Sequence, residues 1–125
     1  MRIMVVDDEE DVQLLYRQQF RKELRKGKIE IHFALSAKEA IEYLKSQGVD
    51  NLLLILSDIN MPGMNGLELL KIIKENYEHI KVFMITAYGD EENYRLAMEY
   101  GADGYLHKPV EFGTLKEKIF DCWDF

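Results

Sequence analysis

Five short apolar runs alternate with amphipathic stretches along the chain, and this alternation constrains the fold more than any other feature. The apolar runs predict β-strands at residues 3–6, 29–35, 52–57, 81–85 and 104–107. After each run comes a stretch with apolar residues at helical spacing, which predicts five helices in all. Strands that alternate with helices are joined by right-handed crossovers, so they form a parallel sheet with helices on both faces. The expected fold is therefore a doubly wound α/β sheet of five parallel strands.

The expected helices and one loop carry recognisable end signals. Ser36 followed by Glu39 forms a capping box, Gly48 marks the end of that helix, and Asp90 can cap the fourth helix. Pro62-Gly63 predicts a type II turn. Four helices have a clear inner face. Its residues are Val12, Leu15, Tyr16, Phe20 and Leu24 in a single first helix over residues 11–25, Leu69, Leu70, Ile73 and Tyr77 in the third helix over residues 66–77, Tyr94, Ala97 and Met98 in the fourth, and Phe112, Leu115, Ile119 and Cys122 or Trp123 in the last.

Length, charge and cysteine content narrow the class of protein. A chain of 125 residues is expected to be one domain, residues 1–125. The net charge of −7 argues against nucleic acid as a direct ligand, because neutralising phosphates takes a basic face. The single cysteine, Cys122, is expected in the core and fits a reducing compartment. There is no signal peptide and no apolar run near the roughly 18 residues of a membrane span, so we expect a cytoplasmic protein without membrane contact.

Polar and charged residues end the predicted strands: Asp7 and Asp8, Asp58, Thr86, and Lys108. In open parallel sheets, ligands bind beyond the carboxyl ends of the strands, so these side chains should gather at one edge. Carboxylates about 4 Å apart repel by roughly 4 kcal/mol at an effective dielectric near 20, which a cation can relieve. A cluster of oxygen ligands suits Mg²⁺ or Mn²⁺ better than zinc. The pattern therefore predicts a divalent metal site with a lysine beside it.

Taken together, four motifs make the chain resemble the receiver (CheY-like) domain of bacterial two-component response regulators. They are paired acids after the first strand, Asp58 followed by MPGMNG, Thr86-Ala87 after the fourth strand, and Lys108-Pro109 after the fifth. The resemblance extends from Arg2 to Ile119. It implies a flavodoxin-like sheet of strand order 2-1-3-4-5 and a receiver domain over residues 1–125.

The resemblance also implies a role for each acid. Asp58 would be the phosphoacceptor, taking a phosphoryl group from a histidine kinase or a histidine phosphotransfer protein. Asp7, Asp8, Asp58 and the backbone carbonyl of Asn60 would hold Mg²⁺. Lys108 would pair with Asp58 and then with the phosphoryl oxygens. Such chemistry consists mostly of positioning plus neutralisation of charge on the equatorial oxygens, which suits these residue types.

A second set of implied roles concerns the response to phosphorylation. Thr86 would move its hydroxyl onto the phosphoryl group, and Tyr105 would rotate inward behind it. The output would be a downstream protein effector bound to the face made by the fourth helix, fifth strand and fifth helix, and a phosphorylation-dependent dimer stays open. The Lys108-Pro109 bond would be cis. The protein would catalyse only its own phosphorylation and dephosphorylation.

Two other functions stay open at this stage. One is a receiver-like adaptor that works without phosphorylation. The other is a phosphohydrolase of the haloacid dehalogenase type, which wants an aspartate as general acid two residues after the nucleophile; here that residue is Asn60, which cannot donate a proton in that role. Tyr88 is expected to flank the phosphoryl group and hinder its hydrolysis, and Ser57 has no evident role.

Overall fold

The expected parallel sheet is present, with its strands in the order β2-β1-β3-β4-β5. The computed structural model describes residues 1–46, 51–87 and 89–123. The strands are β1 (Arg2–Val6), β2 (Glu30–Ala34), β3 (Leu52–Asp58), β4 (Lys81–Ala87) and β5 (Gly104–Lys108). The helices are α1 (Asp11–Gln19), α2 (Arg21–Arg25), α3 (Ala37–Ser46), α4 (Gly66–Asn76), α5 (Glu91–Glu99) and α6 (Phe112–Cys122). Gly48 and Tyr88, on which two predictions fall, lie outside the described residues.

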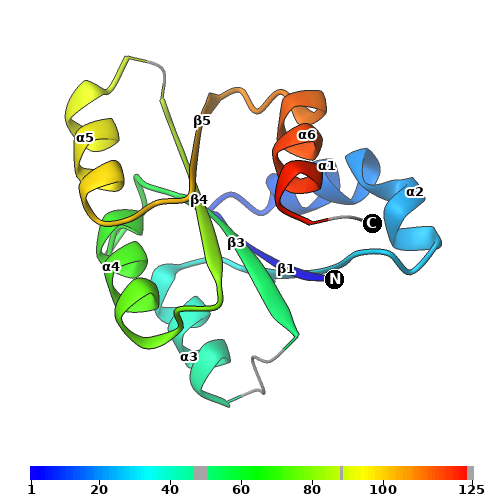
Figure 1. The fold of residues 1–125 in the computed structure, drawn as a ribbon, viewed down its shortest axis with the longest axis horizontal. Helices are drawn as coiled ribbons and strands as arrows, with labels where there is room; N and C mark the ends of the chain where they lie inside the picture. Colours follow the sequence, from blue (N-terminus) through cyan, green and yellow to red (C-terminus); the bar gives the residue numbers. More distant parts are fainter. Residues whose placement is uncertain (47–50, 88, 124–125) are drawn as a thin grey trace.

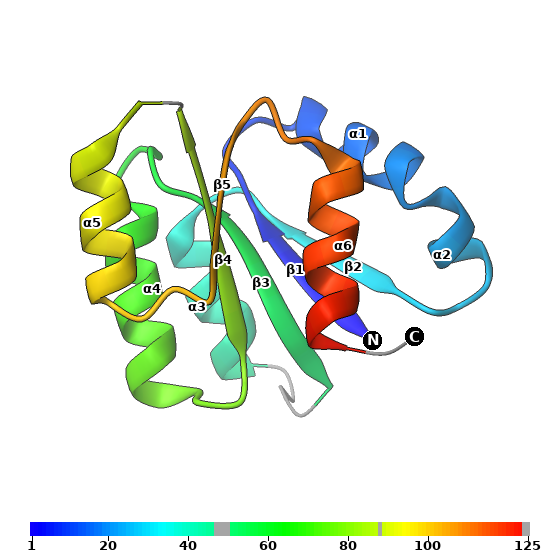
Figure 2. The ribbon, with the colours of Figure 1, turned by 45° about the horizontal axis from the view of Figure 1, so that its top comes forward.

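Helices cover both faces of the sheet and enclose two separate cores. Helices α3, α4 and α5 lie on one face, and α1, α2 and α6 lie on the other (Figures 1 and 2). Because side chains alternate along a strand, Met4 and Val6 face the core under α3, α4 and α5, while Ile3 and Val5 face the core under α1, α2 and α6. The three central strands, β1, β3 and β4, read as nearly continuous apolar runs because both of their faces are buried.

The predicted first helix is two helices, so the described part of the chain has six helices rather than five. The helix is interrupted at Phe20, whose backbone leaves helical geometry at φ −102° and ψ 19°. The Phe20 ring is buried and packs against the rings of Tyr16 and Phe112. Helical periodicity runs through this point in the sequence, and the interruption coincides with a tertiary contact to α6 that periodicity does not encode.

The predicted helix ends are largely correct. Asp90 accepts a hydrogen bond from the Asn93 N–H and caps α5, and the Ser36 hydroxyl accepts from the Glu39 N–H. Glu39 differs from a full capping box, because its carboxylate accepts from Leu35 N–H instead of the Ser36 N–H. Gly63 has a φ of 77°, as the second central residue of a type II turn requires.

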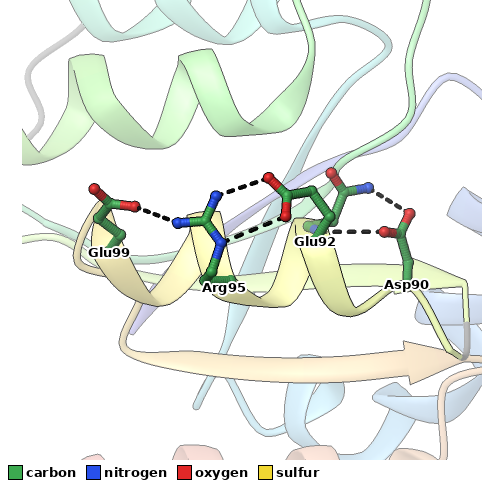
Figure 3. A network of polar contacts seen from close by, with 5 residues as sticks. Asp90, Glu92, Arg95 and Glu99 are labelled. Atoms are coloured by element: carbon green, nitrogen blue, oxygen red, sulfur yellow. Dashed lines mark hydrogen bonds and ion pairs between the residues drawn. The ribbon is translucent and has the colours of Figure 1, made fainter.

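Several residues expected in the core are exposed instead. Leu15, Tyr94, Met98 and Cys122 all lie at the surface, while Ala97, Leu115 and Ile119 are buried as expected. A helix packed on a sheet buries only a narrow stripe, and these four residues fall at its margin. The exposed side of α5 also carries a polar network in which Arg95 bridges Glu92 and Glu99, with Asp90 bonded to Asn93 nearby (Figure 3).

Candidate functional site

Asp7, Asp58 and Lys108 meet at the carboxyl-terminal edge of the sheet. The Lys108 Nζ donates a 2.7 Å hydrogen bond to Asp58 Oδ2 and lies 3.8 Å from Asp7 Oδ2. All three side chains fall on the side of the sheet that α1 and α6 cover, because each lies two residues after an apolar residue of that core: Val5, Leu56 and Leu106. The Asp58 carboxylate, only 4% exposed as a residue, is thus held beside a cation that spans from β5 across β4.

The three acids form a cluster that suits a divalent cation. One carboxylate oxygen from each of Asp7, Asp8 and Asp58 lies within 4.8 Å of the others. Asp8 is exposed and Asp7 is half-buried, so the cluster opens to solvent on one side. Oxygen ligands from two loops with room for water are what Mg²⁺ takes in proteins. The residues present therefore fit a hard divalent metal ion.

The electrostatics of the site favour a bound cation. Burial raises the pKa of Asp7, and the neighbouring Asp58 charge adds to the rise, while the Glu9 N–H bonded to Asp7 at 2.9 Å and the Lys108 ammonium oppose it. Burial by itself would lower the pKa of Lys108, but the hydrogen bond to Asp58 and the charges of Asp58, Asp7 and Glu9 raise it above its usual value. Lys108 is therefore held in its charged form, and a single ammonium faces several carboxylates.

The backbone beneath Asp58 is held by two close contacts. The Ser57 hydroxyl, fully buried, donates a 3.0 Å hydrogen bond to the Asp58 carbonyl oxygen, which is the role that the sequence left unexplained. Gly66, the first residue of α4, packs so near that a Cβ placed there would lie 2.1 Å from the same oxygen. The MPGMNG loop thus needs glycine at its end, because the start of α4 is pressed against the peptide of Asp58.

Thr86 and Tyr105 lie on the opposite side of the strand ends. Thr86 is adjacent to Ile85, so its side chain faces the α4 and α5 layer, where Tyr105 packs against the apolar core. Both hydroxyl oxygens are buried without a hydrogen-bond partner among the described residues. Burial and the Asp90 charge raise the pKa of Tyr105; the nearby Thr86 hydroxyl opposes this rise, although the two do not meet with hydrogen-bond geometry. A buried hydroxyl without a hydrogen bond lowers the stability of the folded state, so Thr86 is a donor that an acceptor brought to the site would stabilise.

Asn60 is exposed in the loop after β3.

Tyr16, which the sequence pattern placed only in the core, also lies near the acids of the site. Burial raises the pKa of Tyr16, and the charges of Asp7 and Asp58 raise it further, so the ring lies near both acids. Beside Lys108 a groove of about 420 Å³ opens to the surface, and most of its wall is apolar: Val12, Leu15 and Tyr16 on one side, Pro109, Val110 and Phe112 on the other. Leu15, which helical periodicity placed on the inner face, is exposed at the rim of this groove, so the sequence pattern gave no signal for it.

One further observation agrees with an expectation from sequence. The Lys108-Pro109 peptide bond is cis. None of the described helices has the length and hydropathy needed to cross a lipid bilayer.

Comparison with known proteins identifies relatives over almost the whole chain. The family model for the response regulator receiver domain matches residues 3–120. The response regulator protein PilR of Pseudomonas aeruginosa is 34% identical over 118 residues, which cover 94% of this chain and 25% of PilR. The chain spans between 17% and 49% of the length of the curated relatives it matches first.

Solved structures agree with this assignment. A CheY-like receiver domain protein from Methanospirillum hungatei superposes with a TM-score of 0.84 at 31% identity, covering 97% of this chain and 91% of that one. The receiver domain of the Saccharomyces cerevisiae response regulator Ssk1, crystallised with the histidine phosphotransfer protein Ypd1, superposes with a TM-score of 0.82 at 26% identity. That match covers 97% of this chain and 87% of the other.

Proposed function

This chain belongs to the response regulator receiver domain family of two-component systems, and from that premise we propose that Asp58 is its phosphoacceptor. A carboxylate oxygen of Asp58 would attack the phosphorus of a phosphohistidine on a partner protein. The new O–P bond forms as the P–N bond breaks, and the histidine nitrogen keeps the electron pair. The observation that carries this proposal is the nearly buried Asp58 carboxylate with Lys108 Nζ at 2.7 Å.

Asp7, Asp8, Asp58 and the backbone carbonyl of Asn60 would hold a Mg²⁺ ion, which neutralises charge on the transferring phosphoryl group when bound. The spacing of the three carboxylates and the raised pKa of Asp7 support this assignment. Lys108 would hold a phosphoryl oxygen from the other side. Its ammonium is already placed against Asp58, so no rearrangement of the chain is needed to present it.

Thr86 and Tyr105 would convert the new charge into a change of surface. The Thr86 hydroxyl, which has no hydrogen-bond partner among the described residues, supports this role, because a phosphoryl oxygen at Asp58 would supply a strong acceptor. The Tyr105 ring contacts Tyr94 of α5 at a centroid distance of 4.8 Å. A movement of Thr86 toward Asp58 would free space next to Tyr105 and alter its packing on Tyr94. The face made by α5, β5 and α6 would therefore be where a downstream protein effector binds.

The phosphodonor would dock on the apolar groove beside Lys108. The groove adjoins the phosphoacceptor, and Leu15 on its rim is exposed. The Ypd1–Ssk1 complex supports a histidine phosphotransfer protein or a histidine kinase as donor for a domain of this fold. We also propose that residues 1–125 form one receiver domain and that the protein is cytoplasmic. It would catalyse only its own phosphorylation and dephosphorylation and act on no separate substrate.

Intact-mass spectrometry tests the proposal. The protein is incubated with acetyl phosphate and Mg²⁺, and a labile adduct of one phosphoryl group should form. When EDTA is present from the start, no adduct should form. Asp58→Asn should abolish the adduct, whereas Asp121→Asn, an exposed acid on α6, should keep it. Steady turnover of a phosphomonoester would instead favour a phosphohydrolase, and the absence of any adduct would favour a phosphorylation-independent adaptor.

A further inference from the structure

A cluster of basic side chains occupies α2 and the turn after it. Five of the 16 basic residues of the chain fall within residues 21–28, and all five are exposed: Arg21, Lys22, Arg25, Lys26 and Lys28. We name these five residues the basic patch. Helix α1 begins near the carboxyl-terminal edge of the sheet, and the chain leads away from that edge through α2 (Figure 2). The patch is therefore separate from the site around Asp58.

Two carboxylates next to the patch in the sequence are already bound to other cations. Glu23, within the same segment, pairs with Lys116 of α6 at 3.1 Å. Glu30, just beyond it, pairs with Arg2 at 3.0 Å. Within residues 1–46, 51–87 and 89–123, no ion pair joins a member of the basic patch to a carboxylate. The result is a local surplus of positive charge on a protein whose net charge is −7.

Three residues of the basic patch line a small hollow between α2 and α6. The hollow has a volume of about 140 Å³ and is lined by Lys22, Glu23, Lys26, Lys28 and Phe120. This is well below the roughly 300 Å³ at which small-molecule sites begin, and it suits a single side chain. Phe120 is 44% exposed and gives the hollow an apolar wall. A backbone hydrogen bond closes the turn at its rim: the Lys28 N–H donates to the Glu23 carbonyl at 2.9 Å.

We infer that the basic patch and its hollow bind a short acidic segment of a partner protein, with one apolar side chain of that segment against Phe120. Charge complementarity selects the acidic partner. The net negative charge of the chain favours a short acidic segment over a nucleic acid or an anionic bilayer. Either of these would extend beyond the patch and be repelled by the acidic remainder of the surface. The interaction goes beyond phosphoacceptance, and it leaves the Asp58 edge open.

Fluorescence anisotropy with two labelled peptides tests this inference on the whole chain. One peptide is a run of glutamates with a single central leucine, and the other has serine in place of that leucine. The leucine peptide should bind more tightly, and Phe120→Ala should remove the difference. The double variant Arg25→Glu/Lys26→Glu should weaken binding by at least about tenfold. The matched control Lys38→Glu/Lys45→Glu, on exposed α3 positions, changes the net charge equally and should change binding by less than about twofold.

Three results would overturn the inference: no binding of either peptide at millimolar concentration, an equal loss in the α3 control, or tighter binding to a single-stranded oligonucleotide or to anionic phospholipid vesicles. Urea unfolding confirms that each variant is folded. Phosphoryl adduct formation at Asp58 should be the same in the patch variant and the original protein. Failure of peptide binding is thereby distinguished from failure of phosphoacceptance.

Discussion

Removing the Lys108 ammonium should expose how strongly it stabilises the buried Asp58 carboxylate. Two unit charges 2.7 Å apart attract by about 6 kcal/mol at an effective dielectric near 20. Desolvation offsets most of this, and the Lys108 side chain is 35% exposed, so the pair lies between a buried one, where loss of a partner costs about 3–5 kcal/mol, and a surface one worth about 0–1 kcal/mol. We therefore expect Lys108→Met to lower the free energy of unfolding by about 2 kcal/mol.

A double-mutant cycle isolates the pair from the other effects of each change. In the original protein, Asp58→Asn should cost little, because Asn can still accept from Lys108 and no longer repels Asp7. In the Lys108→Met background the same change should stabilise, because it removes a buried carboxylate that has lost its cation. Urea unfolding at neutral pH measures both, and about 2 kcal/mol corresponds to a midpoint shift of roughly 1 M for a domain of this size.

Magnesium gives the cycle an independent arm. Added Mg²⁺ should recover part of the stability lost in Lys108→Met, since a ligand that binds only the folded state stabilises it by mass action. The recovery should vanish when Asp58→Asn is added. If Asp58→Asn has the same effect in both backgrounds, to within about 0.5 kcal/mol, then Lys108 and Asp58 are not coupled and the electrostatic account of the site is wrong.

Three further predictions rest on single contacts. Gly66→Ala should destabilise by about 2 kcal/mol or more in urea unfolding, because its Cβ would lie 2.1 Å from the Asp58 carbonyl oxygen; a variant as stable as the original would refute the close packing. Asn65→Ala should cost about 1 kcal/mol in the same assay, because the Asn65 side chain accepts from the Glu68 N–H and caps α4, and an unchanged midpoint would deny that cap a role. Burial and Arg2 lower the pKa of His32, so the unfolded chain binds its proton more tightly. The stability that His32 contributes should be complete above its unfolded pKa of about 6.5 and decline as pH falls through that value, and His32→Gln should lack this decline in a series of unfolding curves.

Local sequence patterns predicted the strands and most helix ends, because these depend on periodicity and on capping residues close in the chain. The same patterns failed at Phe20 and at Leu15, Tyr94, Met98 and Cys122. At Phe20 the helix is interrupted where the ring packs against Phe112, which is far away in sequence. At the four exposed positions, burial depends on how wide a stripe the sheet covers, which no single helix encodes.

From sequence alone, the residues that meet at the candidate site were identifiable, because acids, a hydroxyl and a lysine each end a strand and parallel strands bring their ends to one edge. Only tertiary structure decided which groups pair and which stay unpaired. It placed Lys108 on Asp58 and left the hydroxyls of Thr86 and Tyr105 without a hydrogen-bond partner among the described residues. It also bound Glu23 and Glu30 to distant cations, so that they do not neutralise the basic patch. The physical reason is that pairing depends on distances of a few ångströms between side chains from different elements, whereas sequence patterns report only which face of an element a residue occupies.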